Sequence, residues 1–143
     1  MAGELHLRVI TPDKIALDTH TDSLRVPAVD GLMGILKRHA PMVAALDSGV
    51  LRWNENGQPR HMFVSGGFCE VQDNEVRVVT QAGERPAEID EQRAREAETR
   101  ARERLKVGKS AVGSTGAGEA LDTARAELAL RRALMRLSAK SLE

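Results

Sequence analysis

Few side chains in this sequence are arranged for catalysis. The one cysteine, Cys69, follows two glycines in a predicted strand, where a thiol packs as a small apolar group more often than it attacks a substrate. No serine stands in the Gly-x-Ser-x-Gly pattern of a nucleophile elbow. The histidines lack the spacing and the companion ligands of a metal site; they are His6, His20, His39 and His61. We therefore predict no catalytic residue, no bound metal and a protein that is not an enzyme.

One short segment is similar to part of a phosphate-binding loop but lacks the rest of the motif. Gly108-Lys109-Ser110 is similar to the end of a nucleotide-binding loop. That loop requires a glycine five residues earlier, where Glu103 stands, and a preceding strand, where the pattern is helical. We therefore do not assign a phosphate loop to this segment.

The segment 30–41 holds two candidate contact residues. Leu32 and Met33 lie between Gly31 and Gly34, and two glycines so close allow a tight turn that points apolar side chains outward. The alternative is that both side chains belong to the core. The pattern alone leaves the two interpretations open.

The strongest local charge lies near the end of the chain. Five basic residues face a single acid, Glu127, and they are Arg125, Arg131, Arg132, Arg136 and Lys140. On a helix they form a basic amphipathic face that suits an acidic protein surface. The alternative is a helix face that is simply solvated.

The composition divides the elements that position these residues into two parts. All five prolines and all three aromatic residues lie within the first 86 of 143 positions. Proline and aromatic residues are typical of sheets and turns, whereas the remaining stretch, rich in Ala, Leu, Arg and Glu, can stay helical. We therefore predict a β domain over 1–87 and a helical domain over 88–143.

The 21 basic and 21 acidic residues balance, so the chain has no net charge that would attract nucleic acid, and we predict no nucleic-acid partner.

Alternation and turn residues predict the strands. Leu5, Leu7 and Val9 alternate with polar residues, as in a half-buried strand. Asn56-Gly57 supplies the positive φ angles of a hairpin turn, and a second hairpin turns through Gln72-Asp73-Asn74. Short strands with turns about every ten residues indicate an antiparallel sandwich or barrel.

Helical spacing predicts a hairpin of two helices. The first carries one apolar stripe, formed by Ala94, Ala97, Ala101 and Leu105. A glycine-rich connector over 108–118 should end it, and a second helix should begin near Glu119. The second has two apolar faces, formed by Leu121, Ala124 and Leu128 and by Leu130, Leu134 and Leu137. Its apolar surface exceeds what the first helix can cover, so we expect the β domain or a partner protein to cover the rest.

Four motifs together resemble the epsilon subunits of F-type ATP synthases over essentially the whole chain. They are Gly31-x-x-Gly34-Ile35-Leu36-x-x-His39-Ala40-Pro41, Gly49-Val50-Leu51-Arg52, Val64-Ser65-Gly66-Gly67-Phe68-x-Glu70-Val71 and Glu88-Ile89-Asp90. The resemblance implies an α+β fold, with an N-terminal antiparallel β-sandwich followed by a C-terminal two-helix hairpin. It also implies a non-catalytic rotor subunit of the central stalk, which couples proton translocation to ATP synthesis and restrains ATP hydrolysis through its C-terminal helices.

The resemblance also assigns contact residues. Leu32, Met33 and His39 match the part of the β domain that contacts the gamma subunit and the membrane rotor ring. A second set matches the contacts of members that bind ATP at the hairpin: Glu84, Ile89, Asp90, Arg93, Ala94, Arg100, Arg132 and Arg136. Guanidinium groups pair with phosphate oxygens in forked geometry, which suits a polyphosphate. Regulatory ATP is thus a possible ligand, and no cofactor is required.

The mechanism implied is a change of the hairpin from a folded to an extended form. In the extended form the basic helix would meet the beta and alpha subunits. The family's location and the lack of a targeting segment predict a peripheral protein at the cytoplasmic face of a bacterial inner membrane. The alternative is a free-standing module whose hairpin senses a nucleotide without a rotary complex.

Overall fold

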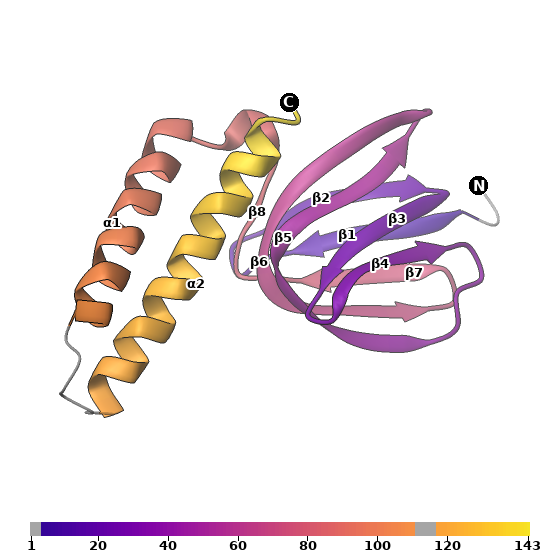
Figure 1. The fold of residues 1–143 in the computed structure, drawn as a ribbon. Coiled ribbons are helices and arrows are strands. Elements are labelled where there is room, and N and C mark those ends of the chain that lie inside the picture. The colour runs from indigo at the N-terminus through magenta and orange to yellow at the C-terminus, as the bar shows by residue number, and fades with distance from the viewer. Residues whose placement is uncertain (1–3, 111–116) are drawn as a thin grey trace.

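The computed structural model describes residues 4–110 and 117–143, which form a β domain, here called the head, and a two-helix hairpin beside it (Figure 1). The strands are β1 (Leu5–Ile10), β2 (Ile15–Thr21), β3 (Ser23–Ala28), β4 (Gly31–Leu36), β5 (Met42–Glu55), β6 (Gln58–Gln72), β7 (Glu75–Val79) and β8 (Gly83–Glu84). A 3-10 turn, η1 (Pro86–Glu88), leads to the helices α1 (Glu91–Ser110) and α2 (Ala117–Lys140). The predicted fold class is confirmed.

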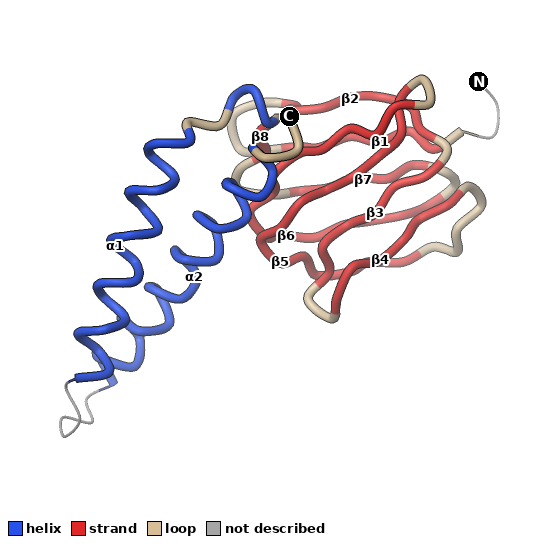
Figure 2. Tube along the Cα trace, turned by 45° about the horizontal axis from the view of Figure 1, so that its top comes forward, coloured by secondary structure: helices blue, strands red, loops and turns tan. Residues whose placement is uncertain are grey.

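The strands join in one sheet with the order β2-β1-β7-β6-β5-β3-β4, and β8 pairs with β6. Figure 2 shows β2, β1 and β7 in succession at one side of the head and β4 at the other. Every described pair is antiparallel except β1 with β7, which is parallel. The sequence did not predict this exception, since β1 and β7 are far apart in the chain. The ladder between β5 and β6 skips Asp47 and Gly66, and two positive φ angles, at Gly66 and Gly67, bend β6 there.

Period-two burial builds the core of the head. β1 alternates between fully buried and half-buried residues along its whole length. The inward side chains of seven strands form one apolar cluster, which includes Leu5, Leu7, Val26, Ile35, Leu51, Trp53, Val64 and Val76. All members of this cluster precede Pro86, so the head has a core of its own.

Both predicted hairpins are confirmed. Asn56 and Gly57 have φ angles of 53° and 77°, the left-handed pair that matches the twist of adjoining strands. Asp73 and Asn74 have φ angles of 50° and 61° between β6 and β7. Gln72 pairs with Glu75, so the second turn is shorter than predicted.

Half of the segment 30–41 is the strand β4, and the two glycines at 31 and 34 lie within this strand and not in the predicted tight turn. β4 pairs with β3 along its whole length, with Leu32 opposite Pro27 and Met33 opposite Val26. Leu32 is 64% exposed whereas Met33 packs against the core, so each of the two interpretations holds for one residue. The apolar run hid the alternation of the strand.

The helices also depart from the prediction at their ends. α1 continues through Gly108 to Ser110, and α2 begins at Ala117, before Glu119. A Cβ on Gly108 would lie 3.1 Å from the Thr123 hydroxyl, so the small residue permits close approach of α2. The middle of the predicted connector, 111–116, lies outside the described residues. Within the described ranges, neither helix is long and apolar enough to span a membrane.

Alanines, more than leucines, form the helix contact. Ala94 and Ala101 of α1 are buried as predicted. On α2, Ala126 and Ala133 are buried, whereas Leu128 is 54% exposed. The predicted apolar face through Leu128 is therefore wrong. The contact between the helices uses small alanine side chains, which allow close approach, and the Leu128 side chain faces solvent.

The head covers the rest of α2. Phe63 of β6, Ile89 and Ala139 are buried together, and Val50, Ala82 and Met135 pack around them. α2 thus lies against β5 and β6 near its C-terminal end (Figure 1). This small cluster, here called the interface cluster, joins the hairpin to the head.

Candidate functional site

Three of the basic residues of α2 contact residues that precede the hairpin. Arg131 lies 3.2 Å from a carboxylate oxygen of Asp47, and its Nε donates to the Ser48 carbonyl at 3.4 Å. The break in the β5–β6 ladder at Asp47 leaves that residue outside strand pairing, where it meets α2. Lys140 donates to the Pro86 carbonyl at 3.1 Å and lies 2.9 Å from Glu143.

Arg136 makes the tightest of these contacts. Its Nε donates to Glu84 at 2.7 Å, and both side chains are about 30% exposed. Its guanidinium carbon lies 4.6 Å from the centroid of the Phe63 ring, within the range of a cation–π contact. An ion pair shielded from water and stacked on an aromatic ring contributes more than a surface pair.

The other two basic residues behave differently. Arg125 is exposed and lies 3.9 Å from Asp122 of its own helix. Arg132 is half-buried and has no ion pair or hydrogen bond from its side chain to any described residue. The basic face is therefore only partly solvated, and only part of it is free to bind a partner protein while the hairpin is folded. Arg131, Arg136 and Lys140 attach the folded hairpin to the head, and we call these three residues the latch.

The residues matched to an ATP site fall into two groups. Asp90, Arg93 and Arg100 line one depression of about 420 Å³ on α1, together with Gln92 and Glu96. Glu84 instead pairs with Arg136, which is a residue of the latch. The structure does not bring Arg132 into the depression on α1.

Local structure explains the remaining matched residues. Asp90 precedes α1, and its carboxylate accepts from the Arg93 amide at 3.0 Å, so it caps the helix. Ile89 belongs to the interface cluster, and Ala94 is buried against α2. The side chains of Arg93 and Arg100 make no ion pair within the described part of the chain and are the groups here that could receive phosphate.

The residues matched to gamma and ring contacts lie on β4 and in the turn after it. Leu32 is exposed, and His39 Nδ1 lies 2.7 Å from the Ala40 carbonyl. Sequence reasoning missed further exposed apolar residues of the head, namely Val29, Leu36, Val43 and Phe68. Val29 binds the Ala45 backbone and Phe68 pairs with Ala45, so part of this set is continuous across the sheet.

No group of three His, Cys, Asp or Glu side chains is placed to hold a metal ion in residues 4–110 and 117–143. Cys69 is fully buried, and burial, with the nearby Glu70 carboxylate, raises its pKa to about 12. The thiol thus stays protonated at neutral pH and is not a nucleophile.

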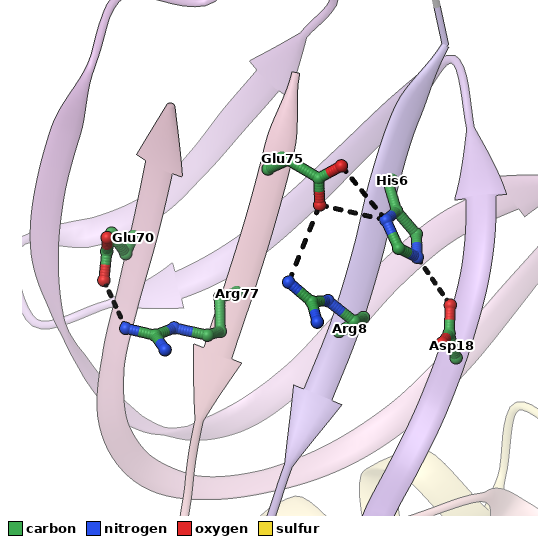
Figure 3. A network of polar contacts seen from close by, with 6 residues as sticks. All are labelled: His6, Arg8, Asp18, Glu70, Glu75 and Arg77. Carbon is green, nitrogen blue, oxygen red and sulfur yellow. Dashed lines mark hydrogen bonds and ion pairs between the residues drawn. The ribbon is translucent and has the colours of Figure 1, made fainter. Parts of the chain in front are cut away.

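The densest titratable network lies on the outer face of β1, β2 and β7 (Figure 3). His6 Nε2 lies 2.6 Å from Asp18, and its Nδ1 lies 2.9 Å from Glu75. Arg8 lies 3.7 Å from the same Glu75 carboxylate. When His6 is protonated, both ring nitrogens donate to carboxylates, so the charged ring ties β1 to both neighbouring strands.

This network predicts a pH-dependent stability. The hydrogen bond with Asp18, and then Glu75, raises the pKa of His6 above its usual value near 6.5. The stabilisation is complete below about pH 6.5 and is lost as the pH rises through the raised pKa. We expect the urea midpoint to fall more from pH 6 to pH 8.5 for the natural chain than for His6→Gln or Asp18→Asn. The same fall in His6→Gln would contradict this assignment.

Comparisons with known proteins cover both parts of the chain. Residues 4–86 match the family model described as the ATP synthase delta/epsilon chain β-sandwich domain, and 87–141 match the long α-helix domain of the same chain. An ATP synthase epsilon chain of Nitratidesulfovibrio vulgaris is 43% identical over 137 residues, 96% of each chain. One of Symbiobacterium thermophilum is 45% identical over 138 residues, 96% of this chain and 93% of that one.

Solved structures share the fold. A chain of the Euglena gracilis mitochondrial ATP synthase has a TM-score of 0.76 and 23% identity, covering 100% of this chain and 84% of its own. Two family models together span nearly the whole chain, and relatives above 40% identity cover almost all of it. The chain belongs to the family of ATP synthase delta/epsilon chains.

Proposed function

We propose that this chain is the non-catalytic epsilon-type subunit of the central stalk of an F-type ATP synthase. The observation that carries the proposal is its end-to-end similarity to relatives named ATP synthase epsilon chains. As a rotor subunit it couples proton translocation to ATP synthesis. The head, through the surface that includes Leu32, binds the gamma subunit and the c-ring, and the complex holds the chain at the cytoplasmic face of a bacterial inner membrane.

Inhibition of ATP hydrolysis by the hairpin is the regulatory half of the proposal. Opening the hairpin costs the latch contacts and the interface cluster but leaves the core of the head intact. The cations of α2 then become available to acidic surfaces of the beta and alpha subunits. The latch residues bind the head in the folded form and the beta and alpha subunits in the extended form. They cannot make both sets of contacts at once, so the two forms exclude each other.

The direct test is ATP hydrolysis by the matching catalytic complex stripped of this subunit. It is titrated with the full chain and with a form that ends at Ala87, which retains the core cluster of the head. We expect both to bind and only the full chain to slow hydrolysis. If both bind and neither inhibits, the hairpin is passive; if neither binds, the stalk assignment is wrong.

Point variants separate docking from latching. Arg132→Glu alters the basic face without removing a latch contact, so we expect weaker inhibition and an unchanged folded hairpin. Asp47→Asn with Glu84→Gln weakens the latch and spares every cation, so we expect stronger inhibition. Unchanged inhibition by Arg132→Glu together with Arg125→Glu would exclude a contribution of these two cations to docking.

ATP at the hairpin is a further part of the proposal. The support is a pair of guanidinium groups, Arg93 and Arg100, that form no ion pair with any residue the structure describes and that line one depression at the start of α1. ATP would favour the folded form by its greater affinity for it. Calorimetry should show binding to the full chain and at least a tenfold loss in Arg93→Gln with Arg100→Gln.

The matched control for ATP binding is Arg95→Gln, since Arg95 is already paired with Glu91 on the same helix. Equal losses in the control would show a general charge effect and no site. A chain that binds ATP but never purifies with a gamma subunit would support a free-standing nucleotide-sensing module instead.

A further inference from the structure

Three basic side chains form a row across adjacent strands of the head. Arg25 of β3 stands directly opposite Arg52 of β5, and Arg52 stands opposite His61 of β6. Opposite residues of antiparallel strands share one face, and neighbouring strands lie about 4.8 Å apart. The three groups therefore lie side by side on the outside of the sheet.

The head does not neutralise this row. Arg25 and Arg52 are both exposed. Neither side chain forms a hydrogen bond or an ion pair with any residue of 4–110 or 117–143. The neighbouring Arg60, by contrast, lies 3.6 Å from Glu55. Like charges directly opposite each other destabilise a sheet. Burial, and then the charges of Arg52 and Arg25, lower the pKa of His61, as expected in an uncompensated positive field.

A depression of about 300 Å³ lies beside the row and reaches the edge strand β4. Its lining includes both arginines and Gly34, which stands opposite Arg25. A Cβ on Gly34 would meet nothing within 4 Å, and its φ is not in the left-handed region, so the fold itself does not require glycine there. The missing side chain keeps the depression open.

Two further lining residues are apolar. Leu36 is 63% exposed at the rim. Trp53 is 3% exposed, and its side chain belongs to the core cluster on the opposite face of β5 from Arg52, so it lies beneath the depression.

We propose that Arg25, Arg52 and His61, with the depression beside them, form a docking site for an acidic, extended segment of a partner protein. Its carboxylates pair with the arginines, and one of its apolar side chains packs beside Leu36. Free phosphate would satisfy the charges but would leave the apolar rim unused, which favours a polypeptide. The site lies wholly on the head and does not require the hairpin to open, so the proposal goes beyond the inhibitory mechanism.

The test uses the full chain and a synthetic peptide in which glutamate and leucine alternate. Calorimetry measures the binding. We expect saturable binding of the glutamate–leucine peptide that weakens with added salt, and no binding of a glutamine–leucine peptide. Arg25→Gln with Arg52→Gln should weaken binding at least tenfold and raise the melting temperature, because it removes a like-charge pair.

Two variants make the result specific. Lys14→Gln with Arg104→Gln removes the same charge elsewhere and should bind the peptide as the natural chain does. Gly34→Leu fills the depression without changing charge and should weaken binding while the chain stays folded.

In the peptide experiment, three results would overturn the proposal: no binding of the peptide, equal losses in the charge control, or tripolyphosphate binding as tightly as the peptide, which indicates a small-anion site. A dimer that forms at low salt and dissociates with Arg52→Gln would identify a second copy as the occupant and would also overturn it. None of these results bears on the hydrolysis test, so the two proposals fail independently.

Discussion

Phe63→Ala is expected to destabilise the protein by about 3–5 kcal/mol, the usual cost of removing a large buried aromatic side chain. The Phe63 ring is fully buried and is the largest member of the interface cluster with Ile89 and Ala139. The ring also forms a cation–π contact with the guanidinium of Arg136, so the substitution weakens the latch as well. We expect a lower urea midpoint and faster amide hydrogen exchange in the C-terminal half of α2.

The matched control is Phe68→Ala on the same strand. Phe68 is 39% exposed and lies outside both apolar clusters, so we expect a cost below about 1.5 kcal/mol and unchanged exchange in α2. Equal exchange of α2 in the two variants would show that Phe63 does not hold the hairpin to the head.

Gly67→Ala is expected to cost more than about 3 kcal/mol, because two penalties act at one position. Gly67 has a φ of 100°, which L side chains rarely adopt, and an added Cβ would lie 1.9 Å from the Val79 carbonyl oxygen. That oxygen is backbone in the adjoining strand, so β6 and β7 would have to separate. Thermal unfolding measures the loss.

Gly57→Ala separates the two penalties. Gly57 also has a positive φ, 77°, but an added Cβ would meet nothing within 4 Å. It should therefore cost only about 1 kcal/mol from backbone strain. If Gly67→Ala costs no more than Gly57→Ala, the close approach of β6 to Val79 is not a constraint on the fold.

Local signals predicted most of the fold. Alternation marked β1, and the pair Asn56 and Gly57 marked the turn between β5 and β6. β4 was missed because Leu32 to Leu36 are apolar on both faces of the strand, so no polar residue reveals the alternation. Gly108 was taken as a helix end, although close packing against Thr123 stabilises a glycine inside α1. In each failure, tertiary packing overrode a local preference.

The candidate site was only half predictable for a similar reason. The basic face of α2 follows from spacing alone, but its acceptors do not. Glu84 is 52 residues from Arg136, and Ser48 is 83 residues from Arg131. The bend at Gly66 and Gly67 opens the strand ladder at Asp47, and no local pattern shows that this bend faces α2.

The parallel pair of β1 and β7 sets the order of events during synthesis. A ribosome delivers β1 first, but β1 lacks one of its two neighbours until β7 emerges, since His6 and Glu75 are 69 residues apart. The head therefore closes late in its own translation. Once Val79 has been added to the nascent chain, synthesis of the 64 residues that follow it takes about 3 to 13 seconds at ordinary translation rates. The core strands of the head are thus synthesised before the hairpin, and the head holds its complete core cluster without any residue of the hairpin.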